Sequence, residues 1–183
     1  LEFRRVLFRS YFYLLTLAVC THLFGQTPVN PVIQNFGTVV DAPFADLKPD
    51  PSLTYNIVVD LMTGEEDKSV VAFSVNQLAR LMNLHVMGGV PKENMNIIVA
   101  VHGGALWTAL GNELYREKFG VDNPHAPLYQ ELIDQGVKIV VCSQSMFKRK
   151  VDKSQLLPGF EVATSALTTL TMYQLKGYAL MRF

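Results

Sequence analysis

Short apolar runs that alternate with stretches of helical spacing constrain the fold of this chain more than any other feature. The three longest runs cover residues 55–61, 95–101 and 137–142. Each is rich in β-branched residues and carries few polar ones, which is typical of strands buried on both faces of a parallel sheet. Shorter strands are expected at residues 160–163 and 178–182.

The segments between these runs have apolar residues three and four positions apart, as helices do. Glycines or prolines follow several of them and mark their ends. Strands that alternate with helices predict a mostly parallel sheet with helices on both faces, so the expected fold is α/β, a flavodoxin-like three-layer α/β/α domain. Helices are expected over residues 68–83, 105–118, 127–135, 144–150 and 165–176.

Size and charge narrow the classes of function. A chain of 183 residues, 49% hydrophobic, suits one compact domain. The 16 basic and 16 acidic residues balance, which argues against a nucleic-acid partner. The sequence has no Gly-x-Gly-x-x-Gly motif and no P-loop, so no cofactor is expected, although the fold alone leaves flavin conceivable. The histidines lack metal-ligand spacing, so no metal is expected either.

The N-terminal quarter is divided by composition into three segments. Residues 1–10 are similar to an in-frame translation of a sequencing adapter, although a basic start of a signal is the alternative. Residues 11–25 are interpreted as a truncated signal peptide, which implies an exported, periplasmic protein with no stable membrane span after cleavage. An uncleaved anchor and a lipoprotein at Cys20 are the alternatives. Residues 26–53 form a proline-rich arm with a possible edge strand at residues 36–40, and residues 54–183 form the domain.

Three residues with reactive or ionisable side chains stand at the ends of predicted parallel strands, where α/β domains place their sites. They are Asp60, His102 and Cys142. After signal cleavage Cys142 would be the remaining cysteine, so it is either a reactive thiolate or a small buried core residue. His102 could favour the thiolate or only bind the backbone. Asp60 could be a site residue or a turn residue.

Further residues join these as candidates for substrate binding. Gly103 and Gly104 permit a close approach of the backbone to a ligand, or else form a tight turn. Ser143 directly follows Cys142, and Arg149 could favour a thiolate, or be an ordinary solvated charge. No Gly-x-Ser-x-Gly elbow is present, which excludes an α/β-hydrolase. The candidate set is therefore catalytic Cys142 and His102, with Asp60, Gly103, Gly104, Ser143 and Arg149 at the substrate.

Four segments together resemble the DsrE/DsrF-like family, which includes YchN-type proteins. The segments are residues 136–142, 157–159, 165–167 and 177–179, and the resemblance covers roughly residues 53–183. It implies a flavodoxin-like fold and a homo-oligomer, as a dimer, trimer or hexamer. It also implies that Cys142 holds sulfur as a persulfide and exchanges it with a donor or acceptor protein.

The apparent export signal and the arm distinguish this chain from the cytoplasmic relay subunits of that family. It is more similar to the exported DsrE-like group. The expected function is therefore an exported sulfur carrier, or sulfurtransferase-like protein, with persulfide sulfur on Cys142. The alternative is a non-catalytic oligomeric binding or scaffold protein of the same fold.

Overall fold

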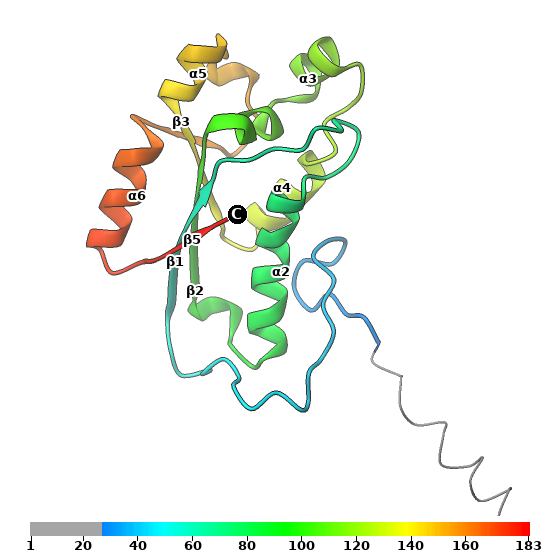
Figure 1. Ribbon diagram of the computed structural model, residues 1–183, viewed down its shortest axis with the longest axis vertical. Coiled ribbons are helices and arrows are strands. Elements are labelled where there is room, and N and C mark those ends of the chain that lie inside the picture. Colours follow the sequence, from blue (N-terminus) through cyan, green and yellow to red (C-terminus); the bar gives the residue numbers. More distant parts are fainter. Residues whose placement is uncertain (1–26) are drawn as a thin grey trace, which may run out of the picture.

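The computed structural model describes residues 27–183, and a single five-stranded sheet lies at its centre (Figure 1). The strands lie in the order β4-β3-β2-β1-β5, and every neighbouring pair is parallel. Each strand begins and ends within one residue of the range expected from the sequence, so the predicted α/β fold is confirmed. The strands are β1 (Tyr55–Leu61), β2 (Met95–Val101), β3 (Lys138–Cys142), β4 (Glu161–Ala163) and β5 (Ala179–Arg182).

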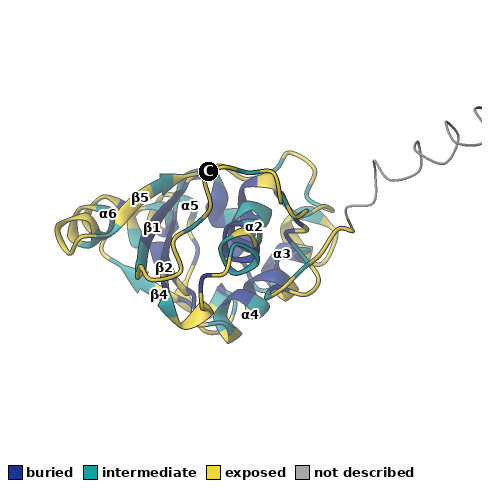
Figure 2. Ribbon diagram, turned by 90° about the horizontal axis from the view of Figure 1, so that it is seen from below, coloured by how far each residue is buried: buried dark blue, intermediate teal, exposed yellow. Residues whose placement is uncertain are grey.

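The helices divide between the two faces of this sheet unequally. Figure 2 shows α2, α3 and α4 on one side and α6 on the other. The main core lies under α2 and α4, whereas on the second face Val58, Ile98 and Val140 pack mainly against α6 and the turn after it. The helices are α2 (Phe73–Met87), α3 (Asn112–Phe119), α4 (Ala126–Asp134), α5 (Ser143–Arg149) and α6 (Ala166–Leu175), with the 3₁₀ turns η1 (Lys92–Asn94), η2 (Gly103–Ala109) and η3 (Lys153–Gln155).

The single helix expected over residues 105–118 is wrong, because the chain there forms η2 and then α3. Leu110 between them is extended and pairs with Leu156 in an isolated antiparallel bridge. The Gly111 N–H donates to the Gln155 carbonyl at 2.8 Å, which fixes the break. A contact with a distant segment therefore overrides the helical spacing.

Two other boundaries differ from the prediction. The helix expected over residues 68–83 begins later, at Phe73, because the Asp67 carboxylate accepts from the Ser69 N–H and hydroxyl and holds a turn. The edge strand expected at residues 36–40 is wrong. Val39 only bridges Val29 in the same arm, so that segment pairs with itself instead of joining the sheet.

One buried asparagine fastens the arm to α2. The Asn83 Oδ1 accepts from the N–H groups of Val32 and Ile33 at 3.0 and 2.9 Å. Its Nδ2 donates to the carbonyls of Ile33, Phe36 and Gly37 at 3.0 to 3.2 Å. Ile33 and Asn83 are both fully buried. Because one side chain satisfies five backbone groups, the arm is an integral layer of the domain.

Replacing Asn83 with leucine should therefore release the arm. The five backbone groups would lose their partner, and we expect a loss of about 2–4 kcal/mol in the free energy of unfolding. Urea denaturation measures the loss, and limited proteolysis should show new cleavage between residues 30 and 40. Asn96→Leu, at an exposed asparagine on β2, is the control and should change little. Equal stability of the two variants would contradict this role.

A second buried polar group joins α4 to the start of α2. The His125 Nε2 accepts from the Ala72 N–H at 2.9 Å, so its Nδ1 carries the hydrogen and donates to the Asn123 Oδ1 at 2.8 Å. His125 is 2% exposed. Burial, with a smaller contribution from the charge of Lys68, lowers the pKa of His125 to about 4. The folded protein therefore holds this imidazole neutral.

Acid should weaken the fold through this histidine. The unfolded chain binds the proton near pH 6.5 and the folded chain near pH 4, so stability falls as pH falls between these values. We expect a loss of about 3 kcal/mol over this window, measured by urea denaturation at a series of pH values. His125→Gln should have a flatter profile, whereas the control Asn96→Leu, which changes no titratable group, should keep the wild-type slope. An unchanged slope in His125→Gln would contradict the assignment.

Candidate functional site

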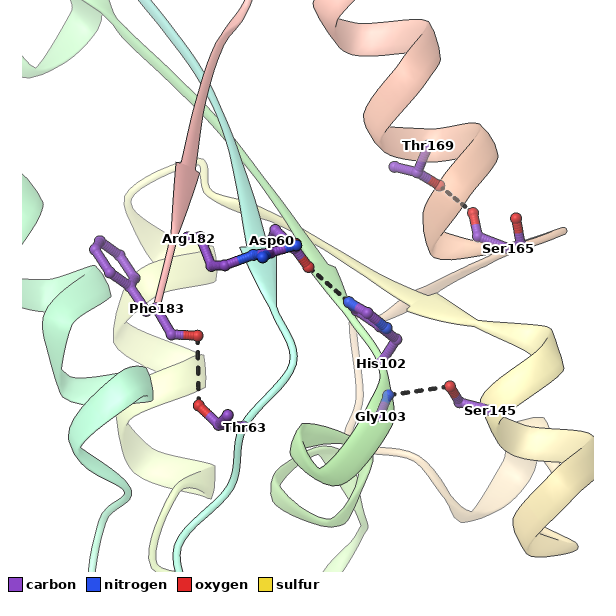
Figure 3. Close-up of polar contacts among 9 residues, drawn as sticks. All are labelled: Asp60, Thr63, His102, Gly103, Ser145, Ser165, Thr169, Arg182 and Phe183. Atoms are coloured by element: carbon purple, nitrogen blue, oxygen red, sulfur yellow. Dashed lines mark hydrogen bonds and ion pairs between the residues drawn. The ribbon is translucent and has the colours of Figure 1, made fainter.

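Four neighbouring strands each bring one polar side chain to the carboxyl edge of the sheet. Arg182 on β5 is in register with Asp60 on β1, and Asp60 is in register with Ala100 on β2. His102 directly follows β2, and Cys142 ends β3. The strands that carry Asp60, His102 and Cys142 are therefore neighbours. Figure 3 shows Arg182, Asp60 and His102 joined in one line.

The Asp60 carboxylate is buried between two nitrogen donors. Its Oδ1 lies 2.6 Å from the His102 Nε2, and its Oδ2 lies 2.8 Å from the Arg182 Nε and 2.7 Å from Nη2. Burial raises the pKa of Asp60, but the hydrogen bonds and charges of His102 and Arg182 outweigh it and leave the pKa below its usual value. The carboxylate is therefore ionised and only accepts. It follows that the His102 Nε2 carries a hydrogen, which leaves Nδ1 as the basic nitrogen of the neutral ring.

The Cys142 thiol lies where two helices begin. Cys142 is the residue before α5, and Ala166 is the first residue of α6. The N–H groups of Ala166, Ser145 and Gln144 and the Ser145 hydroxyl lie around the sulfur and lower its pKa, although Cys142 makes no side-chain capping hydrogen bond to α5. Burial raises the pKa of the thiol, but these donors outweigh burial, and the pKa is lowered. Because helix N-termini favour negative charge, the site favours the thiolate.

The thiol is also confined. Cys142 is 6% exposed and packs against Ala100 and Ala166, with Leu170 beside them. Among the residues that the structure describes, Cys142 is the only cysteine, and its thiol is free. No group of three His, Cys, Asp or Glu side chains in these residues is arranged to hold a metal ion. The same part of the chain contains no helix with the length and apolar character needed to cross a membrane. Cys20 and the proposed signal at residues 11–25 lie outside the described residues.

The other predicted site residues have separate partners. Gly103 has a φ of +55°, and a Cβ there would lie 2.8 Å from the Met62 Cγ, so the tight turn itself requires glycine. A Cβ on Gly104 would make only ordinary contacts. The Ser143 hydroxyl donates to the Thr164 carbonyl at 2.7 Å. The Arg149 guanidinium lies 5.5 Å from the Trp107 ring, and neither Arg149 nor His102 is among the groups that lower the thiol pKa.

Two residues of this edge were missed in the sequence. Ser145 accepts from the Gly103 N–H at 3.1 Å through Oγ, and its hydroxyl lowers the pKa of the Cys142 thiol, so it lies between the turn after β2 and the thiol. The available signal was its spacing, three residues after a cysteine at a helix start, which is the spacing of a capping box. Arg182 could only be found once the strand order was known, because β5 is the last strand in the chain and yet neighbours β1.

Removing the Ser145 hydroxyl should make the thiol less acidic. Ser145→Ala removes a donor that favours the thiolate, so we expect alkylation by iodoacetamide near pH 7 to slow about fivefold. Ser143→Ala is the matched control, because the Ser143 hydroxyl binds a backbone carbonyl. Its alkylation rate should stay within about twofold of wild type. A faster or unchanged rate in Ser145→Ala would contradict the assigned contact.

The sequence of this chain matches one family, and its fold is similar to those of solved structures. The sequence model described as the DsrE/DsrF-like family matches residues 56–183. The solved structure of MTH1491 from Methanobacterium thermoautotrophicum, described as a protein of unknown function, is 22% identical with a TM-score of 0.52 and covers 70% of this chain and 100% of its own. The ychN protein from E. coli is 16% identical with a TM-score of 0.43, covering 70% of this chain and 99% of its own. The search of curated proteins returned no match.

Proposed function

Because this chain belongs to the DsrE/DsrF-like family, whose fold is related to sulfur relay, we propose that it carries sulfur as a persulfide on Cys142. The observation that carries the proposal is the set of donors around the thiol. Backbone N–H groups from the first turns of α5 and α6 lower the pKa of one sulfur. Such donors stabilise a thiolate before the reaction and a persulfide anion after it.

The loading step is a displacement at sulfur. The Cys142 thiolate attacks the sulfane sulfur of a donor such as thiosulfate, and a new S–S bond forms. The S–S bond of the donor breaks, and its electron pair leaves on sulfite. The product is Cys142–S–S⁻, and no proton or external electron is needed. Because the thiol is only 6% exposed, the site favours a small donor or one that displaces the start of α6.

Export and assembly are further parts of the proposal. The apolar segment at residues 11–25 supports an exported, periplasmic location for the sulfur carrier. The family resemblance supports a homo-oligomer, as a dimer, trimer or hexamer, and a partner protein that donates or accepts sulfur. The arm that α2 holds lies outside the matched residues 56–183, so it is an addition to the family domain.

Persulfide loading is tested directly by intact-protein mass spectrometry. Wild type incubated with thiosulfate or polysulfide should gain the mass of one sulfur atom, and dithiothreitol should remove it. Cys142→Ser should gain none and keep its oligomeric state. Ser143→Ala, one residue away, should load as wild type does. A wild type that never gains sulfur from either donor would overturn the proposal.

A non-catalytic oligomeric scaffold is the second candidate, and one observation favours it. The outer side of α6 exposes Leu167, Met172 and Leu175 to solvent while the thiol is buried. A scaffold would need this apolar surface and not the thiol. In that case Cys142 should resist alkylation in the native state and react only after denaturation, which separates the two candidates in one experiment.

A further inference from the structure

We propose that His102 accepts the proton of an incoming acceptor thiol when sulfur leaves Cys142, and that Asp60 and Arg182 position His102 for this role. The inference rests on the proposed function and concerns the second half of the reaction, the transfer of sulfur to an acceptor. His102 is then the base of the site, while the donors around Cys142 favour its thiolate.

The strand register places His102 beside Cys142. Val101 on β2 pairs with Val141 on β3, and the two site residues directly follow them. His102 remains extended, with φ −154° and ψ −171°, and its N–H continues the ladder to the Leu61 carbonyl. Ala100, two residues earlier on the same face, packs against Cys142. The imidazole therefore lies on the face of the sheet that carries the thiol, on the neighbouring strand.

The ion pair behind His102 decides which nitrogen is basic. The Asp60 carboxylate accepts from Nε2 at 2.6 Å, so Nε2 holds its hydrogen and Nδ1 carries the free lone pair. Nδ1 has no hydrogen bond to another described residue, and the side chain is 21% exposed. A small thiol at the edge of the sheet therefore has a base within its reach.

Arg182 acts on this base only through Asp60. Its guanidinium binds the carboxylate with both Nε and Nη2, and its side chain is 70% exposed. Asp60, Arg182 and Cys142 are the titratable groups of the sheet that surround His102. The helix α6 that covers this face carries no charged residue, and the cations of α5 lie at its far end, with Arg149 on Trp107. Arg182 is thus a positioning residue.

The transfer step balances with the groups present. The persulfide anion Cys142–S–S⁻ first takes up one proton from water and becomes Cys142–S–SH. The acceptor R–SH gives its own proton to the His102 Nδ1, and the resulting thiolate attacks the outer sulfur of Cys142–S–SH. A new S–S bond forms in R–S–SH. The Cys142 S–S bond breaks, and its electron pair stays on the Cys142 sulfur as a thiolate, which the N–H groups of α5 and α6 stabilise. The imidazolium stays beside the Asp60 carboxylate until its proton passes to the Cys142 thiolate or to water.

The experiment separates loading from transfer. The full chain is loaded with thiosulfate or polysulfide, mixed with glutathione as the acceptor, and followed by mass spectrometry at a series of pH values. His102→Asn should load as wild type does but transfer about 100-fold more slowly near pH 7. The deficit should narrow above about pH 9, where the acceptor is already a thiolate, whereas general damage to the site would persist there.

The two positioning residues should shift the acid limb of the transfer rate in opposite directions. Arg182→Gln removes a positive charge, so the imidazole takes up its proton at higher pH and the acid limb moves up. Asp60→Asn removes a negative charge, so the acid limb moves down. Arg116→Gln is the matched control, since Arg116 pairs with Asp122 at 2.7 Å on the surface with both side chains exposed, and it should leave the profile unchanged.

Several outcomes would overturn the inference. If wild type loads sulfur and His102→Asn transfers it within about threefold of the wild-type rate, His102 is not the base. The proposal that Cys142 carries sulfur would then still stand. If wild type never gains sulfur, both the role of His102 and the proposed sulfur carrier are refuted. If Asp60→Asn fails to fold, the exposed Arg182→Gln still decides the positioning role. ¹⁵N NMR of the unloaded protein should find the Nε2–H tautomer at His102, and the Nδ1–H tautomer would refute the geometry.

Discussion

Parallel strands end at one edge of their sheet, and the helices that follow begin there with N–H groups that have no helical partner. This constraint organises the site. The first turns of α5 and α6 both lie at the end of β3. Their unpaired N–H groups therefore surround the side chain of the last residue of that strand. In this chain it is a sulfur, and a hydroxyl from Ser145 completes the shell. The same edge must also accommodate the buried carboxylate of Asp60, whose burial requires the nitrogen donors of β5 and of the turn after β2.

The strands and the identity of the edge residues could be predicted from the sequence because they depend on local pattern. A run such as residues 95–101 has one favourable structure whatever surrounds it, and the carboxyl-end rule then selects His102. The break between η2 and α3 could not be predicted, since it depends on the bridge from Leu110 to Leu156, far along the chain. Arg182 was missed for the same reason, because its role exists only after the fold places β5 beside Asp60. Ser145 differs, because its spacing from Cys142 was a local signal.

The site separates two electrostatic tasks between two sets of groups. Neutral donors, chiefly backbone N–H groups, act on the sulfur, whereas charged side chains act on the imidazole. A thiol stabilised by dipoles keeps its low pKa without a neighbouring cation whose own titration would alter it. This explains why Arg149 can lie against Trp107, away from the sulfur. Because the thiol does not need His102 to ionise, the lone pair of the imidazole can accept a proton from another group.

The attachment of the arm has a consequence for how the molecule faces its surroundings. Asn83 lies in the second half of α2, which runs opposite to the strands and so approaches their amino ends (Figure 1). The arm therefore enters the domain far from the edge that carries Cys142. The five backbone contacts of one asparagine thus hold the arm against the domain without using the edge at which the thiol lies.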